Sequence, residues 1–257
     1  MRLKLLAAAI AGSVVAGGAV AADLPTYKAP PVYAPPPPAW SWTGCHVGAN
    51  VGGGWQRNGA YDPQAGAGAG GDTGDGFVGG GQVGCDYQMS AWVFGVQGMI
   101  DGAGIKGSHA YPGDPSETLG ANTSWFAAET ARIGYAVMPQ TLLYLRGGVA
   151  EAGIRYTDVD PAVSAYSPYW GSANVARTGW TLGGGLEYSF ARNWSIFVEY
   201  DYMGFGSRNT TLSYSAPNPA NAVPYTYKET NDLQTVLVGL NFKFDWAASP
   251  APIAARY

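Results

Sequence analysis

The sequence has little charge and, beyond its N-terminus, no long apolar run. Only 12% of its 257 residues are Asp, Glu, Lys or Arg, about half the share of a soluble protein. The formal net charge of -4 gives no basic surface for nucleic acid. No second stretch approaches the ~20 apolar residues of a membrane-spanning helix, so the mature chain could enter a membrane only through strands.

What the sequence has in abundance is glycine and aromatic residues. It contains 38 glycines, about twice the usual share, and 13% of its residues are aromatic. The apolar and aromatic content excludes a disordered chain, and the lack of a strict period of three excludes collagen. Glycine at this density also disfavours a soluble helical protein. A sheet protein that turns an apolar face to lipid fits this composition.

The N-terminus predicts export. Met1 to Lys4 is basic, Leu5 to Val20 is apolar, and Ala19 to Ala21 has the small-residue pattern of a cleavage site. We therefore expect residues 1–21 to be a signal peptide rather than a membrane anchor. Residues 22–42 are proline-rich and predict an extended periplasmic linker, with docking to a periplasmic partner as the alternative.

Eight segments with a period of two follow the linker, and they predict one antiparallel sheet. Short turns near residues 90–91, 139–140 and 191–193 alternate with long polar loops near 57–75, 107–121, 157–173 and 207–229. This arrangement is typical of outer-membrane barrels, whereas a soluble lipocalin-like barrel would keep its apolar face inside. Charged residues lie in mid-strand on the glycine-rich face, so that face is assigned to the lumen. The prediction is an all-β fold, an eight-stranded antiparallel up-and-down transmembrane β-barrel over residues 43–244, with a tail at 245–257.

Aromatic residues are expected in two girdles, one at each membrane surface. Glu129 breaks the pattern because alternation places it on the lipid face. The girdle near the short turns comprises Tyr87, Trp92, Tyr135, Phe190, Trp194 and Phe244, and the girdle near the long loops comprises Trp55, Phe77, Trp125, Trp180 and Tyr202.

Several motifs resemble those of the small outer-membrane β-barrel proteins of alphaproteobacteria, the outer-membrane immunogenic, porin-like and OmpA-like transmembrane-barrel group. The clearest is the opening strand Trp42-Thr43-Gly44-Cys45-His46-Val47-Gly48. The resemblance implies an eight-stranded barrel in the outer membrane and no agreed biochemical activity. Further matches occur, in the same order, at residues 131–135, 143–150, 198–200 and 238–244.

Cys45 and Cys85 are expected to face each other on the first two strands. If the first long loop centres near residue 65 or 66, the two positions pair and share a face, so a disulfide can form. The alternative is two small apolar residues. His46 has the opposite parity to Cys45, so no metal site is predicted. The glycine motif at residues 79–84 lies inside a strand, so no dinucleotide or other cofactor is predicted.

The lumen is expected to hold a charge network. The turn at residue 139 places Arg132 opposite Arg146, and two like charges side by side need neutralising. The turn near 192 brings Glu187 close to Glu199. The predicted lumenal network is completed by Asp201 and Lys243, with Asp101, Gln82 and Gln97 nearby. Such a network would plug an eight-stranded barrel, with a narrow gated pore as the alternative.

The function predicted from the sequence is a non-enzymatic outer-membrane protein that contributes structure and surface properties to the cell envelope. The alternative is a small porin or a ligand-binding surface protein. A lipid-active enzyme ranks third, because His109 beside Ser108 is no evidence of catalytic geometry. The expected partners are outer-membrane lipids, lipopolysaccharide and the outer-membrane assembly machinery. No nucleic acid partner is expected, and the protein is expected to be a monomer.

Overall fold

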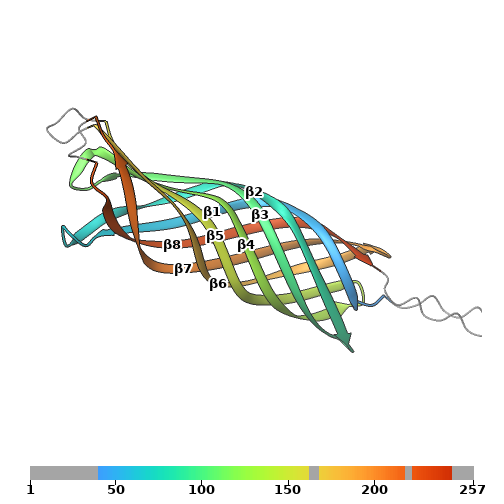
Figure 1. The fold of residues 1–257 in the computed structure, drawn as a ribbon. Coiled ribbons are helices and arrows are strands. Elements are labelled where there is room, and N and C mark those ends of the chain that lie inside the picture. The colour runs from blue at the N-terminus through green and yellow to red at the C-terminus, as the bar shows by residue number, and fades with distance from the viewer. Residues whose placement is uncertain (1–39, 162–167, 218–221, 245–257) are drawn as a thin grey trace, which may run out of the picture. The chain divides into compact units, whose positions relative to one another are not determined.

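A computed structural model describes residues 40–161, 168–217 and 222–244. The predicted signal peptide, most of the predicted linker and the tail at 245–257 lie outside the described residues. Eight strands make up the fold (Figure 1): β1 (Gly44–Asp62), β2 (Ala67–Met89), β3 (Trp92–Tyr111), β4 (Asp114–Met138), β5 (Thr141–Asp160), β6 (Tyr169–Ala191), β7 (Trp194–Ser215) and β8 (Tyr225–Phe244). The described part of the chain contains no helix of the length and apolarity needed to cross a membrane.

The strands close into a barrel. Each strand pairs antiparallel with the next, and β8 pairs antiparallel with β1. Closure leaves no edge strand with unpaired backbone groups, which is the condition for crossing lipid with strands. The predicted eight-stranded antiparallel up-and-down barrel is confirmed.

The strands are longer than predicted, with 19 to 25 residues each. The expected long loops at 57–75 and 107–121 are wrong, because β1 pairs with β2 as far as Asp62 opposite Ala67, and β3 with β4 as far as Tyr111 opposite Asp114. The Asp62 carboxylate closes the first turn by accepting the backbone N–H groups of Gln64 and Ala65. About 9–11 residues suffice to cross a bilayer, so the barrel continues well beyond the membrane at this end. We call this the distal end, and the end with the turns at 90–91, 139–140 and 192–193 the proximal end.

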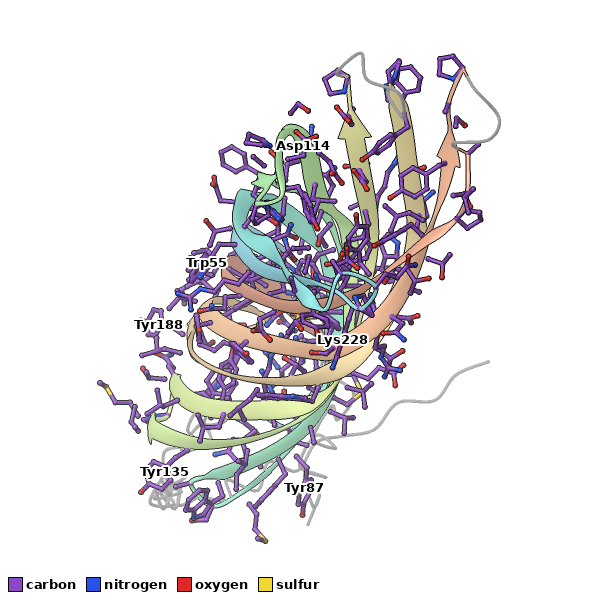
Figure 2. All side chains as sticks on the ribbon, turned by 90° about the vertical axis from the view of Figure 1, so that its left-hand side faces the viewer. Trp55, Tyr87, Asp114, Tyr135, Tyr188 and Lys228 are labelled. Atoms are coloured by element: carbon purple, nitrogen blue, oxygen red, sulfur yellow. A yellow bond between two sulfur atoms is a disulfide. The ribbon has the colours of Figure 1, made fainter. Side chains whose placement is uncertain are left out.

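Apolar side chains face outward and polar side chains face the lumen, as the alternation predicts. Along β2, for example, Phe77 is 89% exposed whereas Gln82 is 4% exposed. Aromatic rings pair at the outer surface, Trp92 with Tyr135 proximally and Trp180 with Tyr202 distally. Figure 2 shows Tyr87 and Tyr135 at one end of the barrel and Asp114 toward the other.

Glu129 points outward and is exposed, opposite Gly98 on β3 and Val149 on β5. Val149 in turn lies opposite Trp180 of the distal girdle. Glu129 therefore lies at the distal rim of the apolar belt, where a carboxylate remains within reach of water.

Residues 40–42, predicted as the end of the linker, pack into the proximal end of the barrel. Trp42 is only 2% exposed and lies against Val93, Leu142 and Tyr144. Its indole N–H donates to the carbonyl of Pro139 at 3.2 Å. Trp42 therefore packs with the barrel at the proximal mouth of the lumen.

Candidate functional site

Cys45 and Cys85 are joined by a disulfide bond in the structure. They lie directly opposite each other on β1 and β2, which is the register expected from the sequence. Their side chains share the outward face with Val47 and Val83. The covalent link fixes the pairing of the first hairpin near its proximal end.

A row of charged residues and glycines follows the backbone pairing across six adjacent strands on the lumenal face. Backbone pairing places Arg132 beside Arg146, and each arginine has a glycine on its other side. Beyond each glycine lies an aspartate, and the order across β2 to β7 is Asp86, Gly95, Arg132, Arg146, Gly183, Asp201. The row is symmetric about the β4–β5 hairpin, so each arginine extends away from the other toward its own aspartate.

The first half of the row is centred on Arg132. Its Nε donates to Oδ1 of Asp86 at 2.7 Å, and a second short bond from the same guanidinium reaches Oδ2. Another nitrogen donates to Glu187 at 3.1 Å. His46 lies 3.4 Å from the Asp86 carboxylate, and the guanidinium sits 5.1 Å from the centre of the Tyr144 ring. All five side chains are buried.

The second half is centred on Arg146, whose side chain is fully buried. Its guanidinium donates to both oxygens of Asp201, at 2.8 and 2.7 Å. It also forms an ion pair with Glu199 at 3.1 Å. The Tyr144 hydroxyl donates to Glu199 at 2.7 Å while its ring contacts Arg132, so this tyrosine connects the two halves.

The glycines in the row are required by the space available. A Cβ on Gly95 would lie 2.0 Å from Oδ1 of Asp86, and a Cβ on Gly183 would lie 1.9 Å from Oδ1 of Asp201. The arginine side chain crosses the intervening strand only because that strand has no side chain there. This accounts for part of the high glycine content.

Most of the predicted network residues come together. Glu187 pairs with Arg132, and Glu199 pairs with Arg146. Gln82 joins the edge of the network through Asn241, which donates to Glu187. Gln97 lines the lumen next to Thr130, whose hydroxyl donates to its backbone carbonyl.

Lys243 is placed elsewhere, at the proximal mouth. Its ammonium donates to the carbonyl of Ser41 and lies 4.5 Å from the centre of the Trp40 ring. It is the second-last residue of β8, too near the strand end to reach the level of the arginines.

Asp101 is close enough to Arg146 for their charges to interact, but the two side chains share no hydrogen bond. The residue is 1% exposed, and the side chain of Asn50 is its polar neighbour. Asp101 lies on the lumenal face, as the alternation predicts. Asp86, His46 and Tyr144 also belong to the network and were not predicted as members, although all three have lumenal parity.

An apolar layer fills the lumen on the distal side of the arginine row. Fifteen buried residues form this cluster, including the large side chains Ile105, Phe126, Met203, Leu233 and Leu237. Arg146 touches its edge through the sulfur of Met99. The polar row and the apolar layer together occupy successive levels of the lumen.

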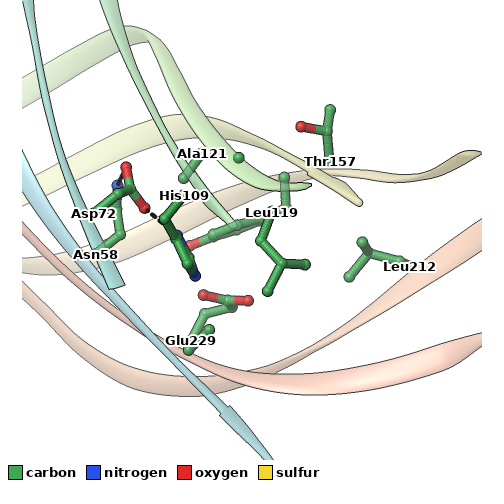
Figure 3. Close-up of a pocket in the computed structure, with 11 residues that line it drawn as sticks. Asn58, Asp72, His109, Leu119, Ala121, Thr157, Leu212 and Glu229 are labelled. Atoms are coloured by element: carbon green, nitrogen blue, oxygen red, sulfur yellow. Dashed lines mark hydrogen bonds and ion pairs between the residues drawn. The ribbon is translucent and has the colours of Figure 1, made fainter. Parts of the chain in front are cut away.

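A small chamber lies further along the lumen (Figure 3). Its volume of about 10 Å³ has room for roughly one water molecule. His109 faces Asp72 there, with 3.3 Å between Nδ1 and Oδ1, and its Nε2 lies 3.0 Å from the carbonyl oxygen of Ala69. Both ring nitrogens of His109 are thus engaged with acceptors. Ser108 points outward instead.

Acids and tyrosines close the distal end of the described barrel. Tyr214 and Tyr227 donate to the buried carboxylate of Asp158, and Tyr225 donates to Asp62. Burial, followed by the nearby charge of Asp158, raises the pKa of Glu117 to about 8. A proton held between Glu117 and Asp158 allows two buried carboxyl groups to lie side by side.

The closed antiparallel barrel, its outward apolar belt and its aromatic girdles define an outer-membrane β-barrel protein. The family model for the outer membrane protein beta-barrel domain matches residues 13–244 of this sequence. The chain therefore belongs to this family. It is 29% identical over 254 residues to the 31 kDa outer-membrane immunogenic protein of Brucella melitensis, covering 94% of this chain and 100% of that protein.

Two solved structures are also similar to this chain. OprG of Pseudomonas aeruginosa has 12% sequence identity and a TM-score of 0.45, with 80% of this chain and 98% of that chain covered. The outer membrane protease OmpT of Escherichia coli has 11% identity and a TM-score of 0.42, with 81% and 99% covered. The protein described here is an outer-membrane protein, and its proximal end, with the short turns, is the periplasmic end.

Proposed function

We propose that this protein is a closed, non-conducting barrel that contributes structure to the outer membrane, rather than a porin. The supporting observation is the lumenal row of six residues across β2 to β7, which are Asp86, Gly95, Arg132, Arg146, Gly183 and Asp201. Both guanidinium groups are buried and bound to carboxylates from opposite sides of the hairpin. An eight-stranded barrel is only wide enough for side chains to fill, so these groups occupy the path that an ion would need.

The apolar layer beside the arginine row supports the same proposal. An ion leaving the polar row would meet Phe126, Met203 and Leu237, each fully or nearly fully buried. Moving an ion through such a layer carries a large desolvation cost. Trp42 fills the periplasmic mouth in addition.

A non-enzymatic role is part of this proposal. His109, one of two histidines in the sequence, uses both ring nitrogens in contacts with Asp72 and Ala69. Its sequence neighbour Ser108 lies on the opposite face of β3, so the two cannot act as a nucleophile and base. We also propose that the barrel is a monomer inserted by the outer-membrane assembly machinery.

Planar-bilayer recording tests the closed lumen. The purified protein should give no steady conductance, and Arg57→Ala, on the outer surface, should behave in the same way. Arg146→Ala removes a lumenal plug group and is the variant in which leakage would first appear. A steady conductance of the unaltered protein that changes in Arg146→Ala would overturn the proposal in favour of a small porin.

The role in the envelope is tested in cells. A strain lacking the protein should become more sensitive to detergent, and the unaltered gene should restore resistance. Full resistance of the deletion strain, together with loss of uptake of a small solute, would contradict the structural role and favour the porin.

A further inference from the structure

Beyond the membrane, the wall of the barrel is interrupted at two places. The ladder between β2 and β3 ends distally with Asp75 opposite Lys106, although both strands continue past this pair. Between β6 and β7, the ladder stops at Trp180, on the distal girdle, and resumes at Ser172 near the tips of the strands. No backbone pair crosses these gaps within the ranges that the structure describes. The turns of the β1–β2 and β3–β4 hairpins accordingly lie apart in Figure 1.

The two interruptions divide the distal part of the barrel into two sheets. The strands β7, β8, β1 and β2 remain paired with one another almost to their tips, and so do β3, β4, β5 and β6. Strands joined by backbone hydrogen bonds tend to open and close as one unit. The gap between β2 and β3 beyond Asp75 and Lys106, which we call the seam, is therefore a line along which the two sheets can separate.

His109 lies where the ladder across the seam would continue. The register of the last β2–β3 pair, extended by three residues, places Asp72 opposite His109. The ring Nδ1 lies 3.3 Å from Oδ1 of Asp72, and Nε2 lies 3.0 Å from the carbonyl oxygen of Ala69 (Figure 3). Ala69 has no partner on β3 and is passed over in the pairing of β2 with β1. A side chain on β3 thus binds a backbone carbonyl that the interrupted ladders leave unpaired.

This contact is complete only when the imidazole is protonated. A carboxylate and a backbone carbonyl accept hydrogen bonds, whereas a neutral imidazole has a single N–H to donate. In either neutral tautomer, one ring nitrogen would turn its lone pair toward an acceptor. The contact is shielded from water, since the side chains of His109 and Asp72 are 16% and 4% exposed. Leaving such a group unsatisfied costs free energy, so loss of the proton weakens the link across the seam.

Other charged groups at the same chamber act in the opposite direction. Glu229 of β8 lines the chamber as well. Burial raises the pKa of Glu229 to about 7, and the guanidinium of Arg177 on β6 opposes this rise. Ionisation of Glu229 adds negative charge to the chamber and favours the imidazolium, so Glu229 delays the loss of the proton from His109 and does not cause it. The lining from β1, β4, β5 and β7 is uncharged near neutral pH and includes Asn58, Leu119, Tyr156 and Leu212.

From this arrangement we propose that His109 is a pH-operated latch between the two distal sheets. The imidazolium holds β2 against β3, and when its proton passes to water the seam opens at the extracellular end. The backbone pairs on the membrane side of Asp75 and Lys106 stay intact. The latch therefore goes beyond the closed-barrel proposal and does not depend on whether the lumen conducts.

A pair of spin labels across the seam tests the latch. Thr73 on β2 and Ser108 on β3 are exposed, and the extended register places them opposite each other. Nitroxides attached there through a keto amino acid leave the disulfide between Cys45 and Cys85 intact. Dipolar broadening of the continuous-wave EPR spectrum reports their separation. The full chain in lipid vesicles should give a broadened spectrum at about pH 5 and should lose the broadening by about pH 8, the range in which histidine changes charge.

Variants identify the group that controls the change. His109→Gln cannot titrate, so its spectrum should be the same at both pH values. Asp72→Asn and Glu229→Gln each remove a negative charge that favours the imidazolium, and each should keep the change but move its midpoint to lower pH. Heat-modifiable gel mobility shows that each variant is folded.

A control pair of labels separates the seam from the rest of the distal end. Thr118 and Val159 lie opposite each other in the ladder between β4 and β5, so labels there should stay broadened at both pH values. The proposal is overturned if the spectrum of the seam pair does not change with pH, if the change persists in His109→Gln or disappears in Glu229→Gln, or if the control pair changes as well. Planar-bilayer recordings at the same two pH values report on the lumen separately, so failure of the latch is distinct from failure of the closed-barrel proposal.

Discussion

Replacing Arg146 with methionine tests the arginine row most directly. The guanidinium makes two hydrogen bonds to Asp201 and one ion pair with Glu199, and its side chain is fully buried. Methionine fills similar volume but leaves both carboxylates buried without their partner. Breaking a buried pair by removing one member costs about 3–5 kcal/mol, and the nearby carboxyl of Asp101 adds a further like charge. We therefore expect Arg146→Met to lose at least about 3 kcal/mol of unfolding free energy.

Equilibrium unfolding in urea, with the protein in lipid vesicles, measures this loss. The control is Arg57→Met. Arg57 is exposed on the outer face of β1, so this substitution should change the free energy of unfolding by less than about 0.5 kcal/mol. A triple variant, Arg146→Met with Glu199→Gln and Asp201→Asn, removes the stranded charges. It should recover most of the loss, because replacing a whole buried ion cluster by neutral groups is often nearly neutral. A loss below about 1 kcal/mol in the single variant, or no recovery in the triple variant, would refute the reasoning.

Three further predictions follow from the same structure. Gly183→Ala should destabilise the barrel by about 1–3 kcal/mol, because the new methyl group overlaps the carboxylate of Asp201; urea unfolding measures it, and an unchanged midpoint would contradict the required gap. Cys85→Ser should cost about 3–4 kcal/mol, since the bond to Cys45 closes a 40-residue loop; the loss should vanish when both proteins are compared under reducing conditions. The raised pKa of Glu117, about 8 against 4.5, means that the folded state binds this proton more tightly than the unfolded state. Its contribution is full below pH 4.5 and is lost as the pH rises to about 8. The hydrogen-exchange protection factors of the distal parts of β4 and β5, which are corrected for the intrinsic pH dependence of amide exchange, should therefore fall over that window, and Glu117→Gln should remove the fall.

The membrane-spanning part of the fold was predictable because one physical rule governs it. Lipid outside and packed polar groups inside impose a strict alternation, and tight turns fix the register. From the turn at residue 139 alone, Arg132 falls opposite Arg146, as observed. The same arithmetic for the first hairpin places Cys45 opposite Cys85.

The extension beyond the membrane was not predictable by that rule. Residues 66–71 are glycine and alanine only, so they show no alternation of polar and apolar side chains. The strand β2 nevertheless begins at Ala67. Their pairing is imposed by β1, which continues to Asp62. Ala69 packs inward against Leu119, Leu212 and Tyr227, but glycine and alanine alone show no difference in polarity between the two faces of the strand.

Asp86, the one carboxylate partner of Arg132 absent from the predicted network, was missed for a different reason. Side chains were matched to their nearest neighbours across one hairpin, whereas Asp86 reaches Arg132 across an intervening strand. Gly95 makes this reach feasible, and a glycine between opposite charges in one register row is a signal that a sequence can supply. Asp201, Gly183 and Arg146 repeat it.

The continuation of the strands past the girdle determines what the outside of the cell meets. The first turn begins at Pro63, eight positions after Trp55, so a tilted strand raises that turn about 20 Å above the girdle. That height exceeds the lipid headgroups, and the backbone over this distance stays hydrogen-bonded. At the described hairpins of β1 with β2 and of β3 with β4, large molecules approaching the cell would thus encounter hydrogen-bonded strands that end in tight turns. Recognition there would depend on side chains brought together from different strands, so antibodies raised against the native rim should fail to bind the heat-unfolded chain.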